Sequence, residues 1–147
     1  MNNVVIERTF NAPVELLWEI WTEAEYIMQW FGGDPNGTVH TVENDVKPGG
    51  SFRINFSDSN GTTHTAFGKY QEVIQHSLLK YTWEWQSEPG HISDVWVVFE
   101  SMGEQSKITL THFNLSPESA HGYFAGWNAA IDKIVKRLLA VPQVKPK

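Results

Sequence analysis

Histidine is the residue type in this sequence most able to bind a metal ion or to move a proton near neutral pH. The six histidines stand at positions 40, 64, 76, 91, 112 and 121. No two of them frame the His-Glu-x-x-His pattern of a helical zinc site, and there is no Cys to add thiolate ligands. His112 and His121 could approach each other where the last strand meets the final helix. The spacing otherwise indicates exposed or hydrogen-bonded histidines, and it predicts no metal site and no cofactor.

The hydroxyl and carboxylate residues also lack the spacing of a catalytic site. The sequence has no Gly-x-Ser-x-Gly nucleophile elbow, no P-loop and no dinucleotide fingerprint. Ser51 follows Gly49-Gly50, which we interpret as a turn before a strand. Glu84 lies between two Trp residues, but strand alternation turns its side chain to the opposite face, toward solvent. The sequence therefore favours a binding protein over an enzyme, and we assign no catalytic residue.

Aromatic residues are the remaining chemical feature, with seven Trp, eight Phe and four Tyr. Their alternation with polar residues places most of them on one face of the predicted strands. One interpretation of such a stripe is core packing. The other is a cavity wall in which Tyr81, His112 and Trp127 supply the polar groups. The candidate cavity residues are Phe52, Ile54, Phe56, Tyr70, Tyr81, Trp83, Trp85, Val97, Phe99, Leu110, His112, Phe124, Trp127 and Ile131.

A sheet and a helix are needed to bring these side chains together, and the hydrophobic pattern predicts both. Helical spacing predicts short helices over 14–21 and 23–30 and a long helix from 117 to about 140. Strands joined by turns, with the helices segregated from them, define an α+β domain in which a curved antiparallel sheet packs on the long helix. We expect one domain over 1–140 and a flexible tail over 141–147. Period-two alternation predicts strands over 4–10, 38–43, 51–57, 63–74, 79–86, 92–100 and 107–113.

Capping residues set the predicted helix boundaries. Pro13 opens the first helix, and a capping box that begins at Thr22 opens the second. Ser116 caps the long helix, with Pro117 as its first helical residue. The predicted apolar stripe of that helix is Phe124, Trp127, Ile131, Ile134, Val135 and Leu138.

Three glycines fall inside predicted elements. Gly68 interrupts a strand and indicates a bulge or the close approach of another segment. Gly122 and Gly126 lie within the long helix, where each costs about 1 kcal/mol relative to Ala. We interpret these two glycines as a sign that a neighbouring segment packs closely, that the helix bends, or that space is left unfilled beside it.

Composition and charge narrow the function classes. The 147 residues carry a net charge of −6, which argues against general nucleic-acid binding. No apolar run is long enough to span a membrane, and charged residues near the N-terminus interrupt the apolar stretch that a secretory leader needs. The lack of Cys fits a reducing compartment. We therefore expect a cytoplasmic protein. Positions 119–147 carry five Lys and Arg residues and one acidic residue. This basic end complements a helix dipole or forms a patch for a partner.

Several motifs together carry a family resemblance from Val4 to about Leu139. The N-terminal ones are Phe10-x-Ala12-Pro13, Leu17-Trp18-x-x-Trp21-Thr22 and Trp30-Phe31-Gly32. The later ones are Lys47-Pro48-Gly49-Gly50, Gly68-x-Tyr70-x-Glu72, Thr82-Trp83-x-Trp85, Val95-x-Val97-x-Phe99, Thr109-x-Thr111-His112 and Gly126-Trp127. In this order they resemble the START-like, Bet v 1-like (SRPBCC) superfamily, and more narrowly the bacterial single-domain proteins similar to the C-terminal domain of the activator of Hsp90 ATPase. Two positions depart from the pattern: Lys47 stands where many relatives have Arg, and Phe31 where many have a second Trp.

The resemblance implies the helix-grip fold, a curved sheet wrapped on a long C-terminal helix around a hydrophobic cavity. It leads to three functional hypotheses. The first is a small soluble protein that binds an apolar or amphipathic small molecule in that cavity. The second is a protein-interaction module of the Hsp90-activator or stress-response type, with a surface at Lys133, Lys136 and Arg137. The third is a cyclase-like or hydrolase-like enzyme that uses His112, Tyr81 or Glu72 at the cavity mouth.

Overall fold

The computed structural model describes residues 3–117, 119 and 122–139. Its order of one strand, two short helices, six strands and a C-terminal helix is the predicted one, so the α+β prediction is confirmed. The predicted tail over 141–147 lies outside the described residues. In chain order the elements are β1 (Val4–Phe10), α1 (Val14–Thr22), α2 (Ala24–Trp30), β2 (Thr38–Asn44), β3 (Ser51–Ser57), β4 (Thr63–Ile74), β5 (Leu78–Trp85), β6 (Ser93–Met102), β7 (Gln105–Phe113), α3 (Tyr123–Ile134) and a π-helix, η1 (Val135–Leu139).

The strands form one seven-stranded antiparallel sheet in the order β1-β7-β6-β5-β4-β3-β2. Consecutive strands from β2 to β7 pair as neighbours, and β1 pairs with β7, with Val4 opposite His112. Because side chains alternate between the two faces, every second residue of β3, β5, β6 and β7 faces the helices, as the alternation in the sequence predicts. The buried side chains on this face include Phe52, Ile54, Phe56, Tyr81, Trp83, Trp85, Val95, Val97, Phe99, Ile108, Leu110 and His112.

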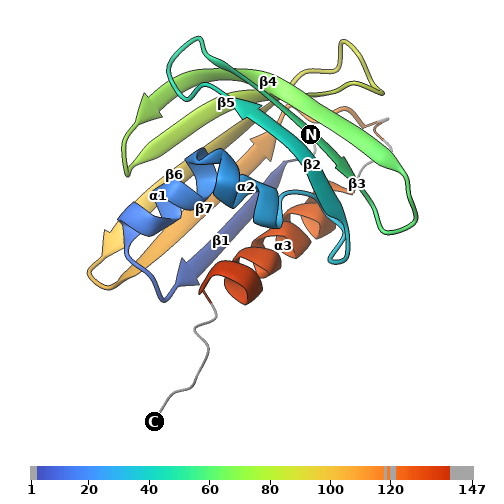
Figure 1. The fold of residues 1–147 in the computed structure, drawn as a ribbon. Coiled ribbons are helices and arrows are strands. Elements are labelled where there is room, and N and C mark those ends of the chain that lie inside the picture. Colours follow the sequence, from blue (N-terminus) through green and yellow to red (C-terminus); the bar gives the residue numbers. More distant parts are fainter. Residues whose placement is uncertain (1–2, 118, 120–121, 140–147) are drawn as a thin grey trace.

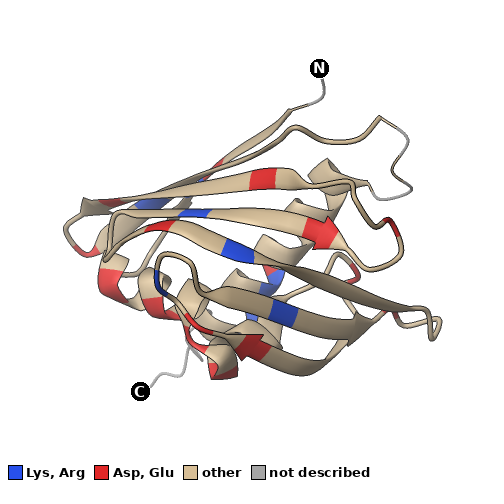
Figure 2. Ribbon diagram, turned by 90° about the horizontal axis from the view of Figure 1, so that it is seen from above, with Lys and Arg blue, Asp and Glu red and all other residues tan. Residues whose placement is uncertain are grey.

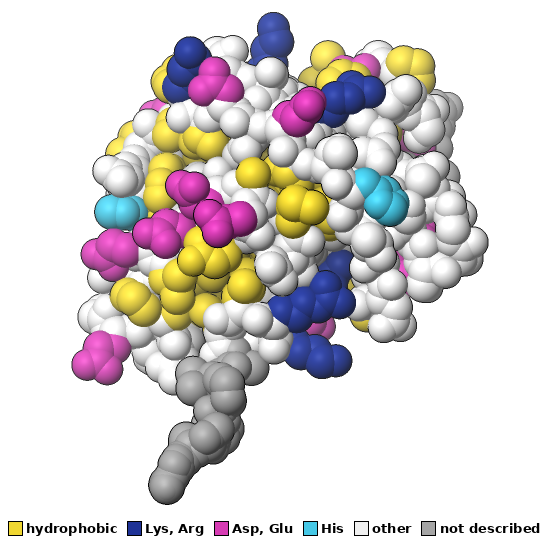
Figure 3. Space-filling model, viewed as in Figure 1, with side chains coloured by type: hydrophobic (Ala, Val, Ile, Leu, Met, Phe, Trp, Pro, Cys, Tyr) yellow, Lys and Arg dark blue, Asp and Glu magenta, His cyan; other side chains and the backbone are white. Residues whose placement is uncertain are grey.

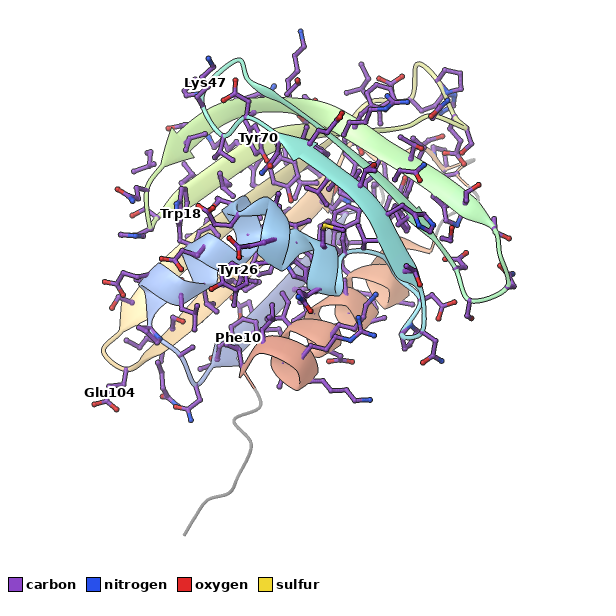
Figure 4. The ribbon with its side chains drawn as sticks, in the orientation of Figure 1. Phe10, Trp18, Tyr26, Lys47, Tyr70 and Glu104 are labelled. Atoms are coloured by element: carbon purple, nitrogen blue, oxygen red, sulfur yellow. The ribbon has the colours of Figure 1, made fainter. Side chains whose placement is uncertain are left out.

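The core lies between the sheet and the helices. Figure 1 shows the sheet curving around the side on which α1, α2 and α3 lie. Trp18 of α1 packs edge-on against Phe99 of β6, with ring centroids 5.2 Å apart. In Figure 4 side chains fill the space between the sheet and the short helices, with Tyr70 on the β4 side and Trp18 on the α1 side. Aromatic rings from both layers therefore form much of the core.

The start of the C-terminal helix was predicted wrongly. Helix α3 begins at Tyr123, not at Pro117, and Gly122 occupies its N-cap with an extended backbone (ψ 93°). Glycine loses more conformational entropy in a helix than other residues, so it marks the point where the helix begins rather than its interior. The Ser116 carbonyl accepts a hydrogen bond from the Ser119 N–H in a turn before the helix. The α-helical part has 12 residues, roughly 18 Å, and η1 continues it. The predicted end at Ala140 lies outside the described residues.

The buried face of α3 also differs from the predicted stripe. Trp127, Ile131 and Ile134 are buried as expected, but Phe124 is 60% exposed. In the first turn of α3 the inward positions belong to Tyr123 and Trp127, which lie one helical turn apart, and this turns Phe124 outward. Val135 is likewise exposed, because η1 begins there and changes the helical period.

The predicted capping box at Thr22 is also wrong. Thr22 is the last residue of α1, and its hydroxyl donates to the Trp18 carbonyl one turn earlier. Glu23 occupies the N-cap of α2 without a side-chain hydrogen bond. Thr22 is buried, so its hydroxyl bonds within α1 and does not cap α2.

Two of the glycine predictions are confirmed by close backbone approaches. A Cβ on Gly68 would collide with the backbone oxygen of Thr82 on the neighbouring strand. A Cβ on Gly33, in the loop after α2, would lie 2.9 Å from the Cα of Gly126 in α3. The pair of glycines lets the loop and the helix touch.

Charge is spread unevenly over the surface. Figure 2 shows acidic positions on strands, turns and helices. In Figure 3 acidic side chains gather over α1 and α2, and basic side chains lie over α3. Within the described residues, no helix is long and apolar enough to cross a membrane.

Candidate functional site

A pocket of about 610 Å³ lies between α3 and one end of the sheet. Its walls come from four segments: the loop 30–35, the β3–β4 hairpin, β5 and the first turns of α3. The close contact of Gly33 with Gly126 joins two of these walls. The size falls within the range of about 300 to 1,000 Å³ that is typical of small-molecule sites.

Aromatic rings form the apolar part of this pocket. Trp83 lines it, and its ring centroid lies 5.4 Å from those of both Trp85 and Trp127. Phe31 stacks on Trp83 at 5.5 Å with an interplanar angle of 21°. Trp83 and Trp85 face the same way because they are two residues apart on β5. These rigid surfaces suit a flat apolar group.

Asp34 forms part of the polar rim and ties two loops together. Its Oδ2 accepts hydrogen bonds from the Ser59 N–H at 2.8 Å and the Ser59 hydroxyl at 2.7 Å. Its Oδ1 accepts from the Asn36 N–H at 2.8 Å. The Ser59 and Asn36 backbone N–H groups lower the pKa of Asp34 to about 2, so the carboxylate is ionised at neutral pH.

A second carboxylate at the rim holds an imidazole. The Nε2 of His64 lies 2.8 Å from the Oδ2 of Asp58, and both residues line the pocket. The His64 ring lies 5.3 Å from Phe56 and 5.9 Å from Trp85. The β3–β4 hairpin therefore carries an Asp–His pair beside the aromatic wall.

Two cationic side chains of the C-terminal helix hold the loop wall. The Nζ of Lys133 donates to the backbone oxygens of Asp34 at 2.9 Å and Phe31 at 3.4 Å. Arg137 donates to the backbone oxygens of Gln29 at 2.8 Å and Pro35 at 3.1 Å. Burial, with Arg137 nearby, lowers the pKa of Lys133 to about 8. These bonds fix the loop against α3.

Tyr123 joins α3 to β5 at the pocket edge. The indole N–H of Trp85 donates to the Tyr123 hydroxyl at 2.9 Å, and the Tyr123 ring packs 4.7 Å from His112. Both Trp85 and Tyr123 line the pocket. The bond thus orients one of the aromatic walls.

A buried chain of hydrogen bonds lies behind Trp127. Its indole N–H donates to Nδ1 of His112 at 3.0 Å, and His112 Nε2 lies 2.7 Å from the Ser93 hydroxyl. An indole nitrogen only donates, so Nδ1 accepts and Nε2 carries the proton, which it donates to Ser93. Ser93 in turn donates to the Trp83 carbonyl at 3.3 Å. Burial lowers the pKa of His112 to about 3, so this imidazole is neutral.

The structure brings together only part of the predicted site. Phe56, Trp83, Trp85 and Trp127 line the 610 Å³ pocket. A separate void of about 20 Å³ is lined by Phe52, Ile54, Tyr70 and Tyr81. Trp83 lines both this void and the larger pocket. The void has room for about one water molecule. Val97, Phe99, Leu110, His112 and Ile131 are buried in the core and line neither space. Phe124 is exposed and lies outside both.

The rim residues were missed by the sequence analysis. Asp34 stands in a Gly-Gly-Asp-Pro segment, and Asp58 and Ser59 stand in the turn between β3 and β4. Turn chemistry explains these residue types fully, so no separate signal marked them. The 25-residue separation of Asp34 and Ser59 is closed only by the fold.

The residues proposed for catalysis do not converge. Tyr81 is buried, which raises the pKa of its hydroxyl, and Glu72 pairs with Lys80 at 3.2 Å. Neither residue lines the larger pocket, nor does His112. The described residues contain no cluster of three or more His, Cys, Asp or Glu side chains placed to hold a metal ion. His121 lies outside the described residues.

A curved antiparallel sheet that grips a C-terminal helix defines the helix-grip class of α+β proteins. A family model described as "Activator of Hsp90 ATPase homolog 1-like protein" matches residues 11–139, so the chain belongs to this family. The resemblance seen in the sequence is thereby confirmed, within the START-like superfamily. No curated protein matches the chain.

Solved structures similar to this chain agree on the fold. Protein CV1439 from Chromobacterium violaceum superposes with a TM-score of 0.83 at 14% identity, covering 92% of this chain and 96% of that one. Protein Ms6760 from Mycobacterium smegmatis gives 0.80 at 17% identity, with 98% and 93% coverage. The AHSA1-like protein from Aeromonas hydrophila gives 0.76 at 18% identity, with 99% and 98% coverage. At these identities the likeness concerns the fold alone.

Proposed function

We propose that the protein binds a small, largely apolar molecule with a flat or aromatic portion in the 610 Å³ pocket. The observation that carries this proposal is the cluster of indole and phenyl rings around Trp83, which lines the pocket and offers an aromatic surface to a ring system. A few polar groups at the rim of an apolar pocket fix the orientation of a bound molecule. Asp34, Asp58 and His64 occupy that position.

The binding energy would come from apolar contact. Each 100 Å² of apolar surface removed from water contributes about 2.5 kcal/mol. A two- or three-ring molecule therefore gains enough to offset part of the cost of association, which is at least about 4 kcal/mol. Offset or edge-on contacts with Trp83 and Trp127 add about 0.5 to 1.5 kcal/mol each.

A titration followed by NMR tests the proposal, with flat aromatic and acyl probes added to the labelled protein. We expect chemical-shift changes at the indole N–H groups of Trp83, Trp85 and Trp127. Ala125 is exposed and lines the pocket, so Ala125→Trp should obstruct it without altering the core. Phe124→Trp, at the neighbouring exposed position of the same helix and outside the pocket lining, is the control. Equal binding by both variants, or shifts confined to residues away from the pocket, would contradict the proposal.

The family's description supports a second candidate, an interaction role of the Hsp90-activator type. The surface predicted for it is reduced, because Lys133 is 4% exposed and Arg137 is bonded to loop carbonyls. An ATPase assay with a bacterial Hsp90, at saturating amounts of this protein, tests this candidate. An unchanged rate would remove it.

A further inference from the structure

We infer that the molecule bound in this pocket is a cation, with an amine or quaternary ammonium group on its apolar body. The inference rests on the proposed function and adds the charge of the ligand to it. Two independent features of the pocket carry it: the sign of its charged side chains and the nature of its walls.

The charged side chains that line the pocket favour a cation. Asp34 and Asp58 both line it, from the loop after α2 and from the β3–β4 hairpin. Among the described lining residues there is no Lys or Arg. Lys133 approaches the same loop, but its ammonium group is buried and donates to the Phe31 and Asp34 backbone oxygens. His64 also lines the pocket and pairs with Asp58, and Lys133 interacts electrostatically with both carboxylates from behind the loop. The carboxylates of Asp34 and Asp58 are nevertheless the charged groups that line the pocket itself, where no lysine or arginine of the described residues does.

The walls select the same sign of charge. The faces of Trp, Tyr and Phe rings carry negative potential and attract ammonium groups within about 6 Å. Trp83, Trp85 and Trp127 enclose one space with Phe31 and Tyr123, so a cation there has several rings within reach. Partial exclusion of water strengthens both the ring–cation and the carboxylate–cation attraction.

An anionic ligand of equal shape meets the opposite conditions. It would place negative charge beside the Asp34 and Asp58 carboxylates and against the negative faces of the rings. This discrimination is a repulsion built into the site, in addition to the attraction of the cation. A neutral ligand would still gain the apolar contact, and its affinity should lie between those of the cation and the anion.

Calorimetric titration with three probes of one shape tests the inference: 1-naphthylmethylammonium, 1-naphthylmethanol and 1-naphthoate. We expect the ammonium compound to bind at least about tenfold more tightly than the alcohol, which corresponds to about 1.4 kcal/mol, and the carboxylate to bind most weakly. Raising the salt concentration from 20 to 500 mM should reduce the ratio, because salt screens partly exposed charges. The salt series needs no variant and decides the matter even if a variant fails to fold.

Asp58→Asn keeps the size of the side chain and removes its charge. We expect the preference for the ammonium probe over the alcohol to fall at least about threefold in Asp58→Asn. Asp94→Asn, on β6 and away from the pocket, should leave the preference unchanged. If the alcohol binds as tightly as the ammonium compound, or the carboxylate binds best, the inference is wrong while the proposed function stands. If none of the three binds, the proposed function fails for aromatic ligands and the inference fails with it.

Discussion

Protonation of His112 should contribute to the destabilisation of this protein in acid. In the folded protein burial lowers the pKa of His112 from its ordinary 6.5 to about 3. Between these values the unfolded chain binds a proton at this site and the folded chain does not, so the free energy of unfolding falls as the pH drops from 6.5 toward 3. One pH unit is worth about 1.4 kcal/mol, so about 2 kcal/mol is lost at pH 5 and about 4 kcal/mol at pH 3. Above pH 6.5 the contribution is fully present.

The structure explains why His112 resists protonation. A protonated Nδ1 has no lone pair to accept the Trp127 N–H that lies 3.0 Å away. Two donors would then face each other in a site with 0% exposure. The acid form therefore loses a hydrogen bond as well as hydration.

Urea unfolding at pH 7.5 and pH 5.0 measures this effect in the native protein and in His112→Gln. A glutamine side chain retains one acceptor and one donor but does not titrate, and every other titratable residue is the same in both proteins. We expect the native protein to lose about 2 kcal/mol more than the variant between the two pH values. Parallel losses would refute the assignment of a neutral, buried His112.

Four further predictions concern stability. Gly68→Ala should cost about 2 kcal/mol in thermal unfolding, because the added Cβ collides with the backbone of Thr82. Ser106→Ala should cost about 1 to 2 kcal/mol in urea unfolding, since its fully buried hydroxyl donates to a backbone oxygen 2.7 Å away. Lys133→Met should accelerate hydrogen exchange in the loop 31–35, whose carbonyls lose their donor. Phe124→Ser should change the free energy of unfolding by less than about 0.5 kcal/mol in thermal unfolding, because Phe124 is 60% exposed.

Much of the sheet could be predicted because alternation is a local property. Once 81–85 adopts extended backbone, Trp83 and Trp85 must share a face and Glu84 must take the other. The register then places each inward side chain opposite another inward side chain on the next strand. No long-range information was needed to assign these faces.

The C-terminal helix could not be predicted as well, because its start and its buried face depend on distant partners. Ser116 and Pro117 have the right types to open a helix, yet α3 begins six residues after Pro117. Lys133 is 4% exposed because carbonyl oxygens of the loop after α2 accept hydrogen bonds from its ammonium group. A helical pattern alone ranks a lysine as a surface residue, and only the loop supplies the acceptors.

The pocket likewise has a part that local periodicity predicts and a part that depends on distant contacts. Its aromatic walls stand on β5 and α3, where the period of the element sets their direction. Its polar rim stands on two loops that meet through Asp34 and Ser59. Loops vary more freely than strands, so relatives with this fold can keep the walls and exchange the rim. If the proposed function is correct, the walls supply the apolar contact, and the side chains that this chain places at 34, 58 and 64 select the chemistry of the bound group.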